Sequence, residues 1–81
     1  MRLPYDTHRI ANLLILHGIP VEDVTEWNDV EDGQIIITDK ISVQVGEYYT
    51  HIVRLLDDGM KIEHENLRPG RLVNRLKELL R

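Results

Sequence analysis

Cysteine is absent from this 81-residue chain. Disulfide bonds are therefore excluded, and the lack of thiols fits a reducing compartment, so we expect a cytoplasmic protein. A single domain of this size has a core that contributes only roughly 3–5 kcal/mol. Small domains without disulfides commonly gain stability from a metal or a partner subunit. We therefore expect self-association or a permanent protein partner.

Long apolar runs are absent too. The longest uninterrupted one, Leu13–Leu16, is far shorter than the roughly 20 residues that cross a bilayer. We therefore expect no membrane span and no signal peptide. Repeats and low-complexity tracts are also missing, which predicts one domain over residues 1–81.

Signatures of enzymes are scarce. The chain has no Walker-type phosphate loop and no dinucleotide-binding fingerprint. Ser42 is the only serine, and the strand register expected below places His51 opposite it, but no glycine-rich elbow surrounds Ser42. Asp57 and Asp58 resemble an acid pair, although hairpin-turn chemistry already explains Asp58. We predict that the protein is not an enzyme.

The four histidines are the candidate ligands for a metal site. His8 and His17 are nine residues apart, which is about half a turn out of phase on a helix, so they cannot chelate one ion together. His51 and His64 are expected as diagonal neighbours on adjacent strands, without a third ligand. The sequence therefore predicts no metal and no cofactor.

Residues 33–65 have the pattern of antiparallel strands joined by tight turns. Two-residue turns are expected at three glycine-containing pairs, Asp32-Gly33, Gly46-Glu47 and Asp58-Gly59. The last turn places Leu55 opposite Ile62 and Arg54 opposite Glu63, with apolar residues on one face and an ion pair on the other.

The turn at Gly46-Glu47 places Asp39 opposite Arg54. Residues 33–45 then form one long, bent strand, in which Asp39 interrupts an apolar face and is paired with Arg54. The alternative is a separate turn at Asp39-Lys40 that splits this strand. We prefer one strand because no glycine favours that turn.

A further strand, roughly Val24–Glu31, is expected before the first turn. It is acidic, as a charged edge strand would be. The alternative for Val21–Trp27 is a short helix of a helix-turn-helix unit. Its carboxylates would disfavour DNA binding because they would face phosphate.

Helices are predicted at both ends. The first is capped by Asp6 or Thr7 and ends at Gly18, with Ile19 completing a Schellman motif. Its apolar stripe is Ile10, Leu13 and Leu14, with His17 as a further candidate. The last helix is capped by Asn66, and its firm part is Arg71–Arg81 because Gly70 disfavours helix. The predicted fold is α+β: a four-stranded antiparallel meander flanked by an N-terminal and a C-terminal helix (αββββα), with a single layer of helices on the sheet.

The expected sheet has apolar residues on both faces. One face carries Ile35, Ile37, Ile41, Val43 and Val45. The opposite face carries Ile36, Val53, Leu55, Met60 and Ile62. Two short helices cannot easily cover both faces, so one face is either half-exposed or an interface.

Charge is divided along the chain. Residues 19–65 hold twelve Asp and Glu against three Lys and Arg, a net charge of −9. Residues 66–81 hold five Lys and Arg against one Glu, a net charge of +4. The basic helix either neutralises the acidic sheet or provides a second binding surface.

These features predict a small interaction protein that docks on a macromolecule through an acidic and aromatic surface. The expected contact residues are Glu26, Trp27, Asp29, Glu31 and Asp32. A phage- or mobile-element-type inhibitor that mimics nucleic acid would have this composition. One alternative is a homo-oligomeric structural or accessory subunit, such as a homodimer. Another, with less support, is a nucleic-acid binder using Arg68, Arg71, Arg75, Lys77 and Arg81.

Overall fold

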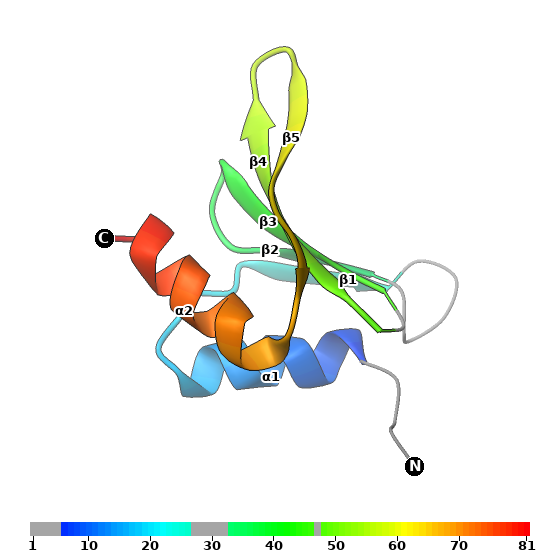
Figure 1. Ribbon diagram of the computed structural model, residues 1–81, viewed down its shortest axis with the longest axis vertical. Helices are drawn as coiled ribbons and strands as arrows, with labels where there is room; N and C mark the ends of the chain where they lie inside the picture. The colour runs from blue at the N-terminus through cyan, green and yellow to red at the C-terminus, as the bar shows by residue number, and fades with distance from the viewer. Residues whose placement is uncertain (1–5, 27–32, 47) are drawn as a thin grey trace.

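The computed structural model describes residues 6–26, 33–46 and 48–81 (Figure 1). Within these residues, two helices and five strands follow one another. They are α1 (Thr7–Leu16), β1 (Asp23–Glu26), β2 (Gly33–Ile36), β3 (Ile41–Val45), β4 (Thr50–Leu56), β5 (Gly59–Leu67) and α2 (Pro69–Leu79). Each strand pairs antiparallel with the next, in the sheet order β1-β2-β3-β4-β5. The predicted α+β class and meander are confirmed, whereas the predicted number of four strands is wrong.

The additional strand arises because the long strand expected at 33–45 is split. Thr38 makes the turn: its Oγ1 accepts hydrogen bonds from the backbone N–H groups of Lys40 and Ile41, both at 3.1 Å. The N–H of Ile37 also donates to the Ile41 carbonyl at 3.0 Å. A threonine hydroxyl thus supplies turn chemistry without glycine. Asp39 is exposed on this turn instead of buried opposite Arg54.

β1 decides between the two interpretations of the segment after Pro20. Asp23–Glu26 is a strand, so the helix-turn-helix alternative is wrong. Gly33 pairs with Glu26 inside the ladder, so the two-residue turn at Asp32-Gly33 is also wrong. The remainder of the strand predicted to reach Glu31 lies outside the described residues.

The other two hairpins have different loops from those predicted. Val45 pairs with Thr50, so residues 46–49 make the connection, and the Gly46 N–H donates to the Tyr49 carbonyl at 3.0 Å. Leu56 pairs with Gly59, so Asp57 and Asp58 form the last loop. As a result, the partner of Leu55 is Met60 instead of Ile62 and the partner of Ile41 is Arg54 instead of Ile52, each a displacement of two residues.

The first helix is capped as expected. The Asp6 carboxylate accepts from the N–H groups of His8 (2.9 Å) and Arg9 (3.2 Å). Gly18 has φ +78°, and the Ile19 N–H donates to the Leu14 carbonyl at 3.0 Å, which is the long bond of a Schellman motif. His17 is exposed, so it does not belong to the core stripe.

The start of the second helix differs from the prediction. α2 begins at Pro69 with Arg68 at the N-cap position, and no side chain caps it. Asn66 instead belongs to β5, where it has φ +53° and its N–H donates to His51 Nδ1 at 3.0 Å. Gly70 lies within the helix, which therefore starts before its expected firm part.

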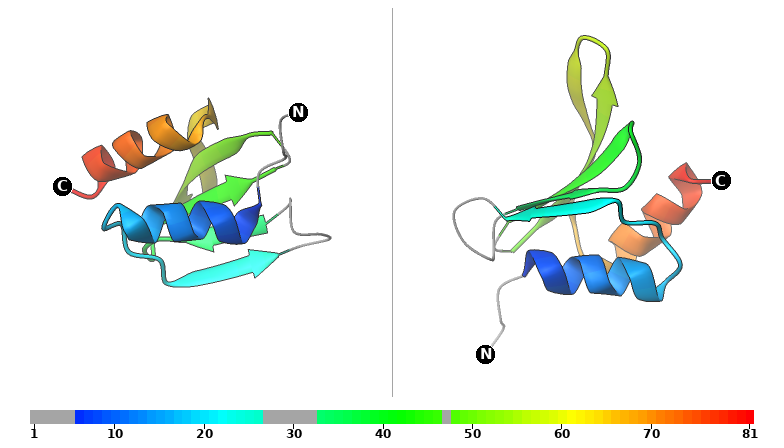
Figure 2. Two further views of the ribbon diagram at one scale, coloured as in Figure 1. Left: turned by 90° about the horizontal axis from the view of Figure 1, so that it is seen from below. Right: turned by 180° about the vertical axis from the view of Figure 1, so that it is seen from behind.

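Both helices lie on one face of the sheet (Figures 1 and 2). α1 packs beneath β1 and β2, α2 packs beneath β4 and β5, and the helices touch each other. The core contains the apolar face predicted from the sequence: Ile35, Ile37, Ile41, Val43 and Val45 are all buried. Leu14, Leu72 and Leu76, fully buried, are contributed by the helices. The single helical layer is thus confirmed.

Two glycines allow a direct test of this packing. A Cβ at Gly33 would lie 2.5 Å from the Thr25 carbonyl oxygen and 2.6 Å from Thr7 Oγ1 of α1, whereas a Cβ at Gly70 would meet nothing within 4 Å. We expect Gly33→Ala to lower the free energy of unfolding by about 1–3 kcal/mol through overpacking. Gly70→Ala should raise it by about 0.5–1 kcal/mol because alanine is the better helix former. Urea denaturation followed by circular dichroism measures both, and equal stabilities would contradict the close approach of α1 to β2.

Candidate protein-interaction surface

The β4–β5 hairpin extends beyond the rest of the sheet (Figure 1). β3 pairs with β4 only from Thr50 to Arg54. The next backbone contact is the Leu55 N–H, which donates to the Lys40 carbonyl at 2.7 Å. Past this point only two strands remain, and a two-stranded hairpin has little stability of its own.

The projecting end of the hairpin exposes apolar side chains. Ile62, 47% exposed, lies opposite Val53 where the hairpin leaves the sheet, and near the end of the hairpin Met60 is 65% and Leu56 46% exposed. Between them, Asp57 and Asp58 form the loop, and neither has an ion pair within the described parts of the chain. We call residues 56–60 the hairpin tip. Because apolar side chains gather on a projecting element, the hairpin tip is a candidate contact surface.

The sheet face turned away from the helices leads into this hairpin. Cross-strand pairing joins Ile36, Ser42, Val53 and Ile62 in one row, because paired residues point to the same side. Leu55 and Met60 form the next pair on that side. The predicted second apolar face, Ile36, Val53, Leu55, Met60 and Ile62, therefore exists as one strip. Exposure along this strip rises from 1% at Val53 to 65% at Met60.

Arg54 and Glu63 are together, although not as direct partners. Arg54 pairs across the strands with Lys61, and its Nε lies 3.5 Å from Glu63 Oε2. Glu63 lies at a register shift in β5, between Ile62 and His64, the partners of Val53 and Ile52. The predicted ion pair is thus present as a diagonal contact.

The acidic and aromatic residues predicted to bind a partner are only partly placed. Glu26 ends β1, and its Oε1 lies 2.6 Å from His8 Nε2, so this carboxylate joins β1 to α1. Trp27, Asp29, Glu31 and Asp32 lie outside the described residues. The hairpin tip, for which the sequence predicted turn chemistry alone, is an exposed acidic surface within the described residues.

The Ser42–His51 arrangement does not form. Ser42 pairs with Val53, is fully buried, and its Oγ accepts from Gln34 Nε2 at 3.2 Å. His51 pairs with Gln44, stacks on Tyr49 with ring centroids 4.3 Å apart, and accepts the Asn66 N–H. Both side chains therefore make hydrogen bonds within the sheet. Among the described residues, no group of three His, Cys, Asp or Glu is placed to hold a metal. None of the helices in that part of the chain is long and apolar enough to cross a membrane.

The basic residues of α2 are spread over two flanks. Arg71 and Arg75 line a shallow hollow of about 380 Å³ with Asn74 and Glu78. Arg75 Nη1 lies 3.0 Å from Glu78 Oε2, so one of these cations is already paired. Lys77 lies in a different hollow, against α1. The remaining two predicted cations, Arg68 and Arg81, are exposed at the two ends of the helix.

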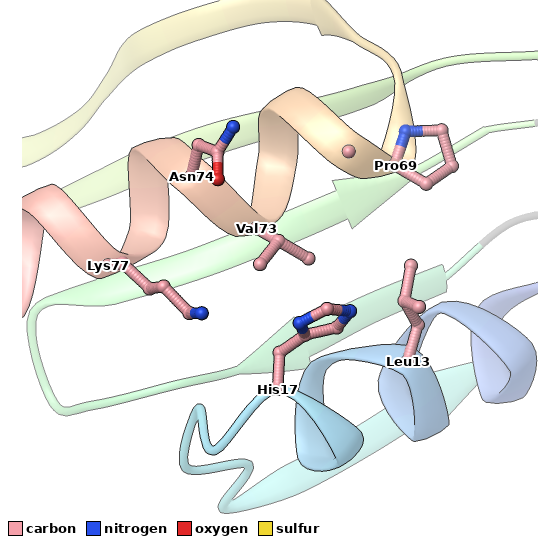
Figure 3. A pocket seen from close by; sticks show the side chains of 7 residues that line it. Leu13, His17, Pro69, Val73, Asn74 and Lys77 are labelled. Atoms are coloured by element: carbon pink, nitrogen blue, oxygen red, sulfur yellow. The ribbon is translucent and has the colours of Figure 1, made fainter.

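A groove of about 450 Å³ lies between the two helices (Figure 3). Leu13 of α1 and His17, just after α1, line one side of it. The other side is lined from α2 by Pro69, Gly70, Val73, Asn74 and Lys77. Leu16, 83% exposed, follows Leu13 by three residues and so extends the apolar surface on that flank of α1. The apolar run Leu13–Leu16 was the sequence signal for this groove, because only Leu14 of the run is buried in the core and the other three side chains lie outside the buried stripe.

No protein-family model, curated protein or solved structure matches this chain.

The exposure gradient along the strip predicts a gradient of stability effects. Val53→Ala should lower the free energy of unfolding by about 2 kcal/mol, because it removes buried methyl groups. Met60→Ala should change it by less than about 0.5 kcal/mol, because Met60 is largely in water. Chemical denaturation of both variants checks this, and a large loss for Met60→Ala would show that the tip serves folding.

Proposed function

We propose that this protein is a non-enzymatic protein-interaction domain that docks through its projecting β4–β5 hairpin. The observation that carries the proposal is the exposure of Leu56 and Met60 on a two-stranded element beyond the sheet, with the exposed Ile62 at the base of that element. Exposed apolar groups on this element add nothing to the core. If a partner buried them, the complex would be stabilised by roughly 25 cal/mol per Å² of apolar surface removed from water.

The charge at the tip indicates the chemistry of the partner. Asp57 and Asp58 are exposed and without an ion pair among the described residues, directly between the apolar side chains. A protein surface that combines an apolar patch with neighbouring Lys or Arg would complement this tip. The acids would steer the encounter, and the apolar contacts would hold the complex. An inhibitor of a nucleic-acid-binding protein, as the sequence suggests, is one form of such a partner.

A nucleic-acid role for α2 has less support. Arg75 is paired with Glu78, and Lys77 faces the groove on another flank of the helix. A phosphate backbone requires several cations aligned on one surface.

The proposal is tested by affinity capture with three immobilised baits: the parent chain, a tip variant and a control variant. Leu56→Ser/Met60→Ser removes the apolar tip, and Ile15→Ser, which changes a 56%-exposed side chain on α1, is the matched control. We expect a protein recovered on the parent and control baits to be retained at least about tenfold less by the tip variant, a loss near 1.4 kcal/mol. Recovery should also fall as salt screens the tip acids. Equal recovery on all three folded baits would contradict docking through the hairpin.

A further inference from the structure

The groove between the helices has the chemistry that the hairpin tip requires. Leu13 and Val73 provide apolar lining, and Lys77 and His17 provide cationic or protonatable groups facing it (Figure 3). Lys77 is exposed and has no acidic partner within the described parts of the chain. At about 450 Å³, the groove falls in the range of roughly 300–1,000 Å³ in which proteins bury small groups.

The hairpin tip also combines apolar side chains with charge, but its charge has the opposite sign. Its apolar members Leu56 and Met60 flank the two aspartates of the loop, and both carboxylates are exposed. The apolar side chains of the tip could enter the groove and contact its apolar lining, while a carboxylate of the tip reaches the Lys77 ammonium. This would bring together an acid and a base that both lack an ion-pair partner in the described structure.

We propose that the partner of the hairpin is a second copy of this chain, whose α1–α2 groove receives the tip. This inference rests on the proposed function and names its partner. The Arg71–Arg75 hollow is the competing receptor on the same chain. It suits the tip less well because it is lined by polar and charged residues alone and because Arg75 is bound to Glu78.

The arrangement of the molecule makes this contact intermolecular. The tip lies at one end of the longest dimension of the molecule, 39 Å, and α1 lies at the other end (Figures 1 and 2). A chain therefore cannot place its own tip in its own groove. Tip and groove are unlike surfaces, so copies would join as a reciprocal pair, a ring or a chain.

Charge reversal on each side provides the test. Sedimentation velocity of the full chain, from micromolar to millimolar concentration, measures association of the parent, of Asp57→Lys/Asp58→Lys and of Lys77→Glu. Each variant should associate at least about tenfold more weakly than the parent, because like charges then meet in the contact. Lys40→Glu makes the same charge change on the exposed β2–β3 turn and should associate as the parent does.

An equimolar mixture of the two reversed variants should recover the association. In that mixture, the basic tip of one variant meets the acidic groove of the other, and the remaining tip and groove also have opposite charges. Circular dichroism of each variant confirms that the fold is kept. Recovery in the mixture, with neither variant associating alone, would establish the contact.

Two outcomes would overturn the inference. A parent chain that remains a monomer over the whole range would exclude a second copy as partner, while loss of a captured protein on the tip-variant bait would still support the proposed function. Association lost in the tip variant but unchanged in Lys77→Glu would exclude the groove as receptor and leave the hairpin as the docking element.

Discussion

The structure depends on one constraint: two short helices cover only one face of a five-stranded sheet. α1 has 10 residues and α2 has 11, and both pack on the face formed by Ile35, Val43 and Ile52. The core closes around this layer, with α1 held close enough to β2 that Gly33 leaves no space for a Cβ. The opposite face and the end of the longest hairpin receive no helix. The surface available for binding is thus what remains after this layer is formed.

The same constraint separates charge within the molecule. The hairpin tip carries carboxylates at one end of the molecule, and α2, on the helix-covered face of the sheet, carries cations. Arg75 and Arg54 are each paired with a glutamate close by, whereas Lys77 and the tip aspartates find no such partner in the described structure. Small acidic domains with separated charge can orient a partner before apolar contact is made. This separation of charge is the basis for the proposed docking by surface complementarity.

The sequence predicted the faces of the sheet correctly but the cross-strand partners wrongly. Leu55 was placed opposite Ile62 and is found opposite Met60, a displacement of two residues. Because side chains alternate with a period of two, such a displacement changes the partner and keeps the face. The division into two apolar faces was therefore correct in spite of wrong registers. The turn between β2 and β3 was not predicted because glycine was the expected signal, whereas the Thr38 hydroxyl makes this turn.

The sequence by itself determined the α+β class, the antiparallel meander, the residues of each sheet face and both ends of α1. These follow from local periodicity, capping and turn chemistry, which act over a few residues. Only the tertiary structure decided which face the helices cover, how far the hairpin projects, and that Leu13 and Lys77 share a groove. These depend on loop lengths, on the bulges in β5 and on contacts between α1 and α2, which lie some fifty residues apart in the chain. No local pattern encodes such contacts, because they result from competition among all elements for one shared core.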